Sequence, residues 1–279
     1  MRNLTFIASA DVSNQAARFR RAFMDKTAVW SVVIQECESI EEARQVLEGR
    51  DHAFVVAPAF RSLLFETATA KGASTKLTQG SDIRYRGGSN TITVSQLARS
   101  VVDCIEEMFI PLYGAKVVIL GSGSAALDMT YECSRAGVDL ITLLDADRNR
   151  AQENLDTFLE NYAKNKMAIL DTEQSRTGHL SATRAYEHCS FKFGSLQALS
   201  SIEEADVIIS FLSSSTVIPD YSSLLRSAQI VCDPWGRSQQ LLQYASAKEC
   251  DCVTYKPIMD YWGKECAELL IEFGNAGIA

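Results

Sequence analysis

Short apolar runs alternate with amphipathic stretches along most of the 279-residue chain. Uninterrupted apolar runs of about four to eight residues are typical of buried strands, and apolar positions spaced three and four apart are typical of helices. Because the two patterns alternate, we expect a parallel α/β sheet. In the N-terminal third, the expected strands are Leu4–Ala8, Ala28–Gln35 and Ala53–Ala57, and the expected helices are Asn14–Met24, Ile40–Gly49 and Ser62–Lys71, the last closed by Gly72.

The alternation breaks at the polar, glycine-containing stretch Thr75–Asn90, which we interpret as a short hairpin or loop at a domain edge. A long amphipathic helix follows from Val94 to Phe109, and its place predicts a connector between two domains. Farther on, we expect helices at Arg148–Tyr162 and Trp262–Phe273 and strands at Val207–Leu212, Ile230–Cys232 and Cys252–Thr254. Residues 163–203 match neither pattern, so a lid, a partner surface and an ordinary insertion all stay open.

The segment Lys116–Asp147 carries the most informative functional pattern. An apolar run, Val117–Leu120, is followed at once by Gly121-Ser122-Gly123-Ser124-Ala125-Ala126, which fits Gly-x-Gly-x-x-Ala. In a dinucleotide-binding βαβ unit the first glycine permits the sharp turn, the second lets a pyrophosphate approach the backbone, and the third small residue lets helix and strand pack closely. The helix N-terminus adds amide donors and a partial positive charge. We therefore predict that residues 121–126 bind the pyrophosphate of a dinucleotide.

Asp145 ends the next apolar run, close to the roughly 20-residue spacing of a carboxylate that binds a ribose hydroxyl pair. A carboxylate there repels a 2′-phosphate, which predicts NAD in preference to NADP. Arg148 and Arg150 follow on the first turn of the next helix and could still reach a phosphate. Because ligands of open α/β sheets bind beyond the carboxyl ends of the strands, we expect a later strand end beside the nicotinamide ribose. That strand end comprises Ser210, Phe211, Leu212 and Ser213.

Composition narrows the classes of function. The net charge is −8, and a nucleic-acid surface needs clustered Lys and Arg, so nucleic acid is not expected as a partner. No apolar stretch approaches the roughly 20 residues that span a bilayer, and nothing at the start resembles a signal peptide, so we expect a cytoplasmic protein without membrane contact. The eight scattered cysteines are then reduced thiols, and no Cys or His stands at metal-ligand spacing. We expect a small-molecule substrate and no metal, and a homodimer stays open.

Together these patterns predict a two-domain α/β protein. Residues 1–92 are expected to form an N-terminal α/β domain, which the C-terminal helix 256–279 joins. Residues 93–255 are expected to form a Rossmann-like, NAD(P)-binding domain.

Several further segments match the sequence motifs of a known enzyme family, in the same order along the chain. Phe54-Val55-Val56-Ala57-Pro58-Ala59-Phe60-Arg61 looks like Asn-Val-Thr-x-Pro-x-Lys with the basic residue offset by one. Gly88-Ser89-Asn90-Thr91, before the connecting helix, matches part of Gly-x-Asn-Thr-Asp-Gly, and the glycine turn looks like Gly-Ala-Gly-Gly-Ala-x. Three more segments match motifs of the same family less closely: Gly72-Ala73-Ser74-Thr75, Ala205-Asp206-Val207-Ile208-Ile209 and Val231-Cys232-Asp233-Pro234-Trp235. In this order the motifs resemble those of the shikimate and quinate dehydrogenase family. The resemblance implies an NAD(P)-dependent oxidoreductase that acts on a small hydroxy or amino acid in a cleft between the two domains, with residues 1–92 as the substrate-binding domain.

The chain departs from the family at its catalytic pair, a lysine and an aspartate. The position nearest the lysine carries Arg61, which can bind a carboxylate but is a poor general base. The position after Asn90-Thr91 carries Ile92, which has no proton to exchange, and Ser13 is the nearest match to the family's paired serines. No residue is therefore carried over as catalyst, and Ser13, Arg61 and Asn90 are expected to bind substrate. An equal alternative stays open, in which Arg61 caps a helix and Asn90 shapes a loop.

Two alternatives stay open. The first is a catalytically silent NAD(P)-binding protein, since the glycine turn is intact while the catalytic pair is lost. The second is a different reductase on the same plan, of the methylene-tetrahydropterin or amino-acid dehydrogenase type. The glycine turn does not separate these, because all of them bind a dinucleotide.

Overall fold

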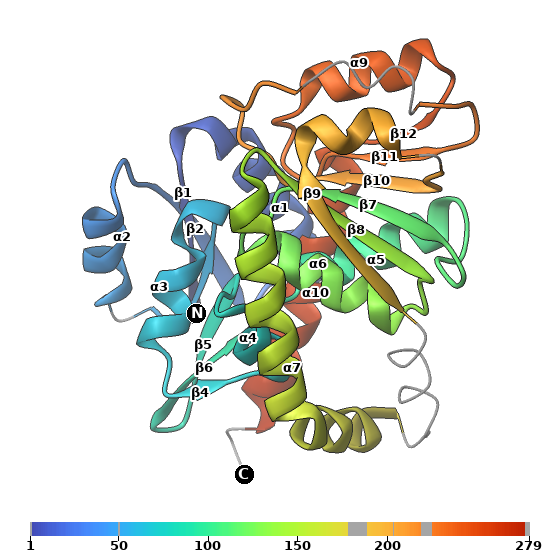
Figure 1. Cartoon of the computed structure of the whole chain (residues 1–279). Coiled ribbons are helices and arrows are strands. Elements are labelled where there is room, and N and C mark those ends of the chain that lie inside the picture. The colour runs from blue at the N-terminus through green and yellow to red at the C-terminus, as the bar shows by residue number, and fades with distance from the viewer. Residues whose placement is uncertain (1, 50, 178–188, 203, 219–224, 277–279) are drawn as a thin grey trace. The chain divides into compact units, whose positions relative to one another are not determined.

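The computed structural model describes residues 2–49, 51–177, 189–202, 204–218 and 225–276. By its internal contacts the chain divides into two units (Figure 1). Unit 1 comprises Met1–Val101 and Lys256–Ala279, and unit 2 comprises Val102–Tyr255. The division falls inside helix α5 (Leu97–Met108), whereas the sequence analysis placed it at residue 92.

Within the described residues, unit 1 is built on a six-stranded sheet in the order β2-β1-β3-β5-β6-β4. Its strands are β1 (Arg2–Ala8), β2 (Trp30–Glu36), β3 (Ala53–Val56), β4 (Ala70–Lys71), β5 (Ile83–Gly87) and β6 (Asn90–Val94). β1 pairs in parallel with β2 and β3, but β5 runs antiparallel to both β3 and β6. The sheet is therefore mixed, and the expectation of a parallel sheet was wrong for this unit.

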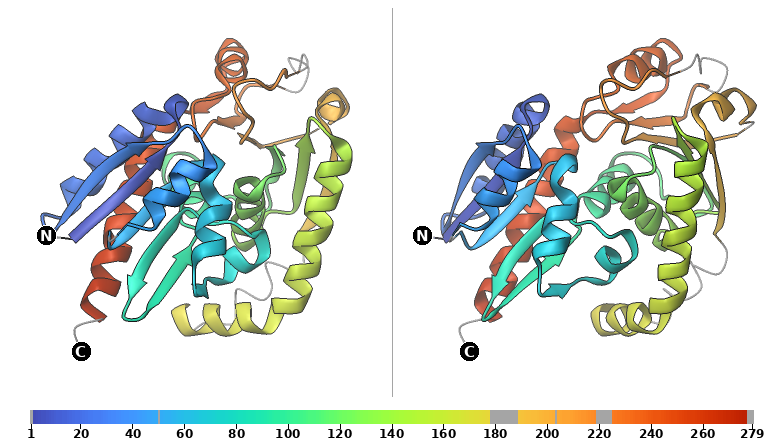
Figure 2. Two further views of the ribbon diagram at one scale, coloured as in Figure 1. Left: turned by 90° about the vertical axis from the view of Figure 1, so that its left-hand side faces the viewer. Right: turned by 60° about the vertical axis from the view of Figure 1, so that its left-hand side comes forward.

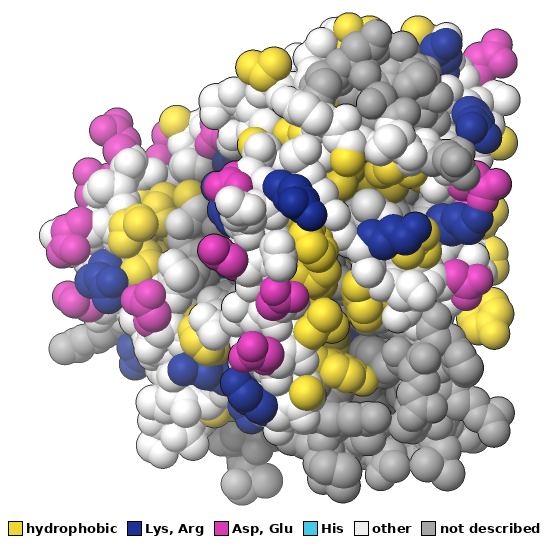
Figure 3. All heavy atoms as spheres, in the orientation of Figure 1, with side chains coloured by type: hydrophobic (Ala, Val, Ile, Leu, Met, Phe, Trp, Pro, Cys, Tyr) yellow, Lys and Arg dark blue, Asp and Glu magenta, His cyan; other side chains and the backbone are white. Residues whose placement is uncertain are grey.

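Two long helices, α1 (Ser13–Lys26) and α10 (Tyr255–Ala276), lie side by side over one face of this sheet (Figure 2). Their contact is aromatic: the ring centroids of Phe19 and Trp262 are 4.8 Å apart, and those of Phe6 and Trp262 are 5.7 Å apart. The edge-to-face geometry stabilises such pairs beyond their buried area. The shorter helices are α2 (Ile40–Leu47), α3 (Arg61–Thr67) and α4 (Ala73–Thr78). Acidic side chains gather over α2 in the space-filling view (Figure 3), where two of them lie in its first turn and favour the positive end of the helix dipole.

The predicted helix Ser62–Lys71 was too long. Helix α3 ends at Thr67, because the backbone amide of Thr69 donates to the Thr91 carbonyl at 3.0 Å and draws the chain into the sheet as β4. Gly72 does not close a helix but precedes α4 as its N-cap residue. The stretch Thr75–Asn90, expected to be a hairpin or loop, holds most of α4, the strand β5 and the turn of the β5–β6 hairpin.

Within the described part of unit 2, six strands form a second sheet in the order β12-β11-β10-β7-β8-β9, with every pairing parallel. The strands are β7 (Lys116–Leu120), β8 (Leu140–Asp145), β9 (Ser190–Ser195), β10 (Val207–Ser210), β11 (Ile230–Cys232) and β12 (Asp251–Val253). The helices are α6 (Ser124–Arg135), α7 (Arg148–Thr177) and α9 (Gln239–Ala247). This is the strand order of dinucleotide-binding sheets, in which the order of strands reverses between β7 and β10. Ligands of such sheets bind at that reversal.

Helix α7 extends far beyond the predicted end at Tyr162 and takes up much of the stretch 163–203. Neither Gly nor Pro interrupts the sequence between Arg148 and Thr177, so nothing local stops the helix. The same stretch also holds β9, and residues 178–188 lie outside the described part. Among the described helices, none combines the length and apolar character needed to cross a bilayer.

The contact between α1 and α10 yields a stability prediction. A Cβ at Gly263 would lie 2.7 Å from the Phe19 carbonyl oxygen and 2.9 Å from the Ala22 Cβ, so the two helices can touch only at a glycine. We expect Gly263→Ala to lower the free energy of unfolding by about 1–3 kcal/mol, measured by urea denaturation. The neighbouring Lys264 is exposed, so Lys264→Ala should change it by less than about 0.5 kcal/mol. Equal unfolding midpoints for the two variants would contradict the packing.

Candidate functional site

The glycine turn connects β7 to α6 at the reversal of strand order. Gly121 has a φ of +105°, and a Cβ there would lie 3.3 Å from the carbonyl oxygen of Phe211. Phe211 in turn donates its amide to the Leu120 carbonyl at 2.7 Å, which locks the end of β10 beside the turn. Because a side chain would be both strained and crowded, this position requires glycine.

Gly123 serves a different purpose. Its φ is negative, it is exposed, and a Cβ there would meet nothing within 4 Å, so the space in front of it is open. It is the N-cap residue of α6 and supplies no side-chain cap. An anion placed in this space would meet the first-turn amides and the positive end of the helix dipole. Ser124 is half-buried, whereas Ala125 and Ala126 are buried against the strands, as close packing of helix and sheet requires.

Hydrogen bonds between side chains stabilise the glycine turn. Ser122 donates its hydroxyl to Asp145 Oδ2 at 2.7 Å, and both side chains are buried. Asn154, on α7, donates its amide to the Ser122 carbonyl at 2.8 Å and to its hydroxyl at 3.2 Å. The sequence analysis missed Asn154. The signal was its helical spacing of four from Arg150, which puts both on one face of α7.

Asp145 lies at the end of β8, as predicted, and its carboxylate is already hydrogen-bonded. Oδ1 accepts from the Asp147 amide at 3.2 Å and from the exposed guanidinium of Arg150. Burial alone would raise the pKa of Asp145, but the hydrogen bonds from Arg150, Ser122 and Asp147 outweigh it and hold that pKa below its usual value. The carboxylate is therefore ionised at neutral pH. The Arg148 guanidinium lies over an aromatic ring instead, with its carbon 5.6 Å from the ring centre of Phe193.

The residues predicted beside the nicotinamide ribose alternate in direction. Ser210 is buried and shares a 2.6 Å hydrogen bond with Ser238, and Leu212 belongs to the hydrophobic core of unit 2. Phe211 is half-buried and Ser213 is exposed, so these two can face a ligand. Successive side chains of an extended chain point to opposite sides, so Ser210 and Leu212 point inward while Phe211 and Ser213 point outward. The prediction that all four residues lie beside the ribose did not allow for this alternation.

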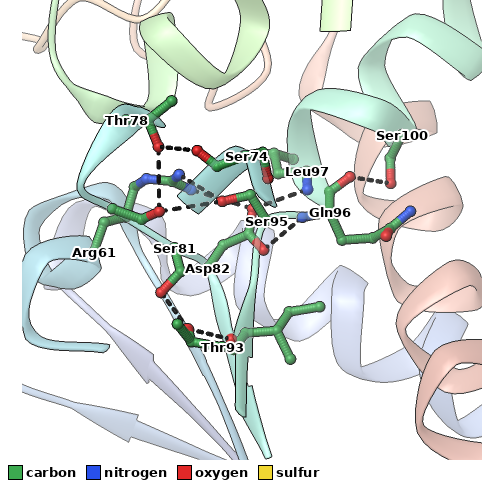
Figure 4. Close-up of polar contacts among 12 residues, drawn as sticks. Arg61, Ser74, Thr78, Ser81, Asp82, Thr93, Ser95, Gln96, Leu97 and Ser100 are labelled. Atoms are coloured by element: carbon green, nitrogen blue, oxygen red, sulfur yellow. Dashed lines mark hydrogen bonds and ion pairs between the residues drawn. The ribbon is translucent and has the colours of Figure 1, made fainter. Parts of the chain in front are cut away.

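Arg61 does not reach outward as predicted. Its side chain is 3% exposed and donates to Asp82 at 3.2 Å and to the Ser95 hydroxyl at 3.2 Å (Figure 4). Burial lowers the pKa of the Arg61 guanidinium against the pull of Asp82. A guanidinium that is buried and paired with a carboxylate cannot also bind a substrate carboxylate, so the predicted role of Arg61 was wrong.

Asp82 explains why this pair is buried. Its carboxylate accepts the backbone amides of Gln96 at 2.8 Å and Leu97 at 2.9 Å, and so caps the N-terminus of α5 (Figure 4). Burial raises the pKa of Asp82, and Arg61 and the two amides oppose that shift. The contact joins α3, the start of β5 and α5, and it carries no sequence motif.

Asn90 lies away from Arg61. It begins β6 beside the turn of the β5–β6 hairpin, whereas Ser95, which contacts Arg61, follows the other end of that strand. Five residues of extended chain span about 16 Å. Gly88–Thr91 does precede the connecting helix as the motif match requires, but the strand β6 lies between Asn90 and the start of α5. Asn90 and Arg61 cannot hold one small substrate together.

Ser13 is the first residue of α1, just beyond the carboxyl end of β1. Its hydroxyl bonds to the Ala10 carbonyl at 3.2 Å and to the carboxylate of Glu36, and it is half-buried. It is thus the one predicted substrate residue that sits at the carboxyl edge of the sheet with partial exposure. Within the described ranges, no three His, Cys, Asp or Glu side chains lie close enough to hold a metal ion.

Neither a protein-family model nor a curated protein sequence matches the chain. Solved structures do. A shikimate dehydrogenase from Aquifex aeolicus superposes with a TM-score of 0.74 at 13% identity, over 96% of this chain and 92% of that one. The chain has the shikimate dehydrogenase fold. This confirms the predicted α/β class with a Rossmann-like domain and the resemblance drawn from the motifs.

Two further structures show the breadth of that fold. A shikimate 5-dehydrogenase from Listeria monocytogenes, in complex with shikimate and NAD, has a TM-score of 0.71 at 15% identity, over 97% of this chain and 92% of that one. A 5-ketofructose reductase from a Gluconobacter species has a TM-score of 0.67 at 14% identity, over 98% and 94%. Because these names cover different substrates, the fold alone does not fix a substrate.

The buried pair gives the second stability prediction. Removing one partner of a buried ion pair leaves an unpaired charge, so Asp82→Ala should lower the free energy of unfolding by about 3–5 kcal/mol in urea denaturation. The pair between Arg18 and Asp260 is a matched control, because both of its side chains are about one-third exposed. We expect Asp260→Ala to cost no more than about 1 kcal/mol. Similar losses in the two variants would mean that Asp82 does not hold the unit together.

Proposed function

We propose that the chain is a nicotinamide-dinucleotide-dependent oxidoreductase of the shikimate dehydrogenase type that acts on a small hydroxy or amino acid. One observation carries the proposal: the strained Gly121 turn and the open Gly123 N-cap stand at the reversal of strand order in an all-parallel sheet. That is where dinucleotides bind in such sheets. The Listeria structure of the same fold is a complex with shikimate and NAD, which supports a nicotinamide dinucleotide as the cofactor.

The residues present fit such a cofactor. The first-turn amides of α6 would bind the pyrophosphate, Gly123 leaves room for it, and Asp145 would accept ribose hydroxyls. Phe211 and Ser213 are the outward-facing residues at the adjacent strand end. The bound nicotinamide would supply hydride transfer, and the protein must position it and exclude water.

We propose NAD as the preferred cofactor. The Asp145 carboxylate is held ionised, and a negative charge at this strand end opposes a 2′-phosphate. To bind the ribose, Asp145 would exchange its hydrogen bond from Arg150 for those from the two hydroxyls. Arg150 is 59% exposed, so releasing it to water costs little.

A second candidate function is cofactor binding without turnover. It is favoured by the burial of Arg61 and Asp82, which removes the titratable pair nearest the family motif from any substrate. General acid–base catalysis needs a titratable group within hydrogen-bond reach of the reacting proton.

A turnover assay separates the two candidates. The protein would be incubated with NAD⁺ and, in turn, shikimate, quinate and a panel of 2-hydroxy and 2-amino acids, and NADH formation followed by absorbance. The oxidoreductase proposal predicts reduction with at least one member of the panel. NADH binding without any turnover would instead support the silent binding protein.

Gly123→Val tests the pyrophosphate site. The protein leaves the space around Gly123 open, so the variant should fold, but its side chain would occupy the place of the pyrophosphate. We expect NADH affinity to fall by at least about tenfold in a fluorescence titration. Ser39→Val, which places the same side chain at the N-cap of α2, controls for a valine at a helix N-cap and should bind NADH normally. Unchanged affinity in a folded Gly123→Val variant would remove the turn from the site.

Asp145→Asn tests the choice of cofactor. Loss of the charge removes a charged acceptor for the ribose and the repulsion of a 2′-phosphate, so we expect NADH affinity to fall about tenfold and the preference for NADH over NADPH to shrink. Asp147→Asn is the matched control, because Asp147 is exposed two residues away. An equal effect of both variants, or none from Asp145→Asn, would place the ribose elsewhere.

A further inference from the structure

Two residues of α7 hold the two oxygens of the Asp145 carboxylate, one directly and one through a neighbour. Arg150 donates to Oδ1 of Asp145. Asn154, one helical turn later on the same face of α7, bonds to Ser122, whose hydroxyl donates to Oδ2 at 2.7 Å. Asn154 lies outside the glycine motif, and only the fold brings it to Ser122, 32 positions away in the sequence.

The chemistry of these groups fixes the direction of their hydrogen bonds. A backbone carbonyl and an ionised carboxylate can only accept, and a hydroxyl has one proton to donate. The side-chain nitrogen of Asn154 must therefore face Ser122, and it donates to the Ser122 carbonyl at 2.8 Å and to its hydroxyl at 3.2 Å. The hydroxyl proton is then left for Asp145. Asn154, Ser122 and Asp145 thus form a polarised relay, in which each hydrogen bond strengthens the next.

The two oxygens of Asp145 differ in how easily their partners can be displaced. Oδ2 is bonded inside the protein, since Ser122 is 1% exposed and Asp145 is 3% exposed. Oδ1 accepts the Asp147 amide at 3.2 Å and the Arg150 guanidinium, which is 59% exposed and can be released to water at little cost. A ligand that displaces Arg150 therefore leaves the bond to Oδ2 intact.

The relay matters because a carboxylate turns easily about its Cβ–Cγ bond. That torsion joins a tetrahedral carbon to a planar one and has broad minima, so hydrogen bonds set the plane of the carboxylate. Once Arg150 is displaced, the Asp147 amide holds one oxygen only, and a single bond does not fix a plane. The buried bond from Ser122 supplies the second point of attachment. Asn154 keeps the Ser122 hydroxyl turned toward Asp145.

We propose that Asn154 is a positioning residue for dinucleotide binding, which acts through Ser122 to orient the Asp145 carboxylate for the ribose hydroxyls. The inference rests on the proposed function, because it requires a dinucleotide at the glycine turn. The half-buried Asn154 would then determine the affinity for NADH without touching the cofactor.

A fluorescence titration of the full chain with NADH tests this role. Asn154→Leu keeps a branched side chain of similar size but removes both donors, so we expect its NADH affinity to be about fivefold lower than that of the unmodified protein. Asn165→Leu is the matched control, because Asn165 is a half-buried asparagine of the same helix that donates to the Asn161 carbonyl at 2.8 Å. It lies about three turns farther along α7 and should bind NADH normally.

A double-mutant cycle separates the orientation of Asp145 from a general effect on the glycine turn. In the Asp145→Asn background no charged acceptor remains to be oriented, so adding Asn154→Leu should lower NADH affinity by less than about twofold. Ser122→Ala removes the middle of the relay but leaves the backbone carbonyl that Asn154 contacts, and it should behave as Asn154→Leu does in both backgrounds. Additive losses of affinity would overturn the inference.

The inference and the proposed function can fail separately. Absence of NADH binding by the unmodified chain would contradict the proposed function, and this inference with it. NADH binding that neither Asn154→Leu nor Ser122→Ala weakens would overturn this inference alone. If urea denaturation shows that Asn154→Leu does not fold, Ser122→Ala and its combination with Asp145→Asn provide the same test.

Discussion

The organisation of unit 2 depends on one close approach, that of Gly121 to the carbonyl of Phe211. At 3.3 Å from the position of a Cβ, this carbonyl would crowd a side chain, and the φ of +105° would strain one. The approach lets β7 turn into α6 while β10 continues beside it. The reversal of strand order and the open helix N-terminus therefore meet at one place. The hydrogen bonds that Ser122 makes with Asp145 and Asn154 stabilise the same turn.

Unit 1 uses its polar residues differently. Arg61 and Asp82 face one another in the interior, where Asp82 caps the N-terminus of α5. A buried ion pair stabilises only when its remaining hydrogen bonds are satisfied, and here two backbone amides and Ser95 satisfy them. The pair connects α3, the start of β5 and α5. Because both side chains are buried, neither is available as an acid or base for catalysis. An enzyme built on this chain must take its acid or base from another residue.

Much of unit 2 could be predicted from the sequence because its signals are local. The apolar run of β7, the two glycines and Asp145 lie within one βαβ unit, where spacing along the chain translates directly into position. The bracing by Asn154 and the burial of Ser210 depend on which way a side chain points. Unit 1 was less predictable, because Arg61 meets Asp82 across 21 positions of the sequence. The motif match placed Asn90 before the connecting helix but gave no sign of the hydrogen-bonded hairpin strand that separates the two.

A calorimetric titration of the full chain with NADH tests the central claim most directly, because binding at the glycine turn needs no knowledge of the substrate. The account predicts one saturable site per chain, with NADH bound more tightly than NADPH and binding lost in Gly123→Val. The absence of heat with either cofactor, at a protein concentration where folding is verified, would contradict it. The turn would then be a structural feature without a dinucleotide.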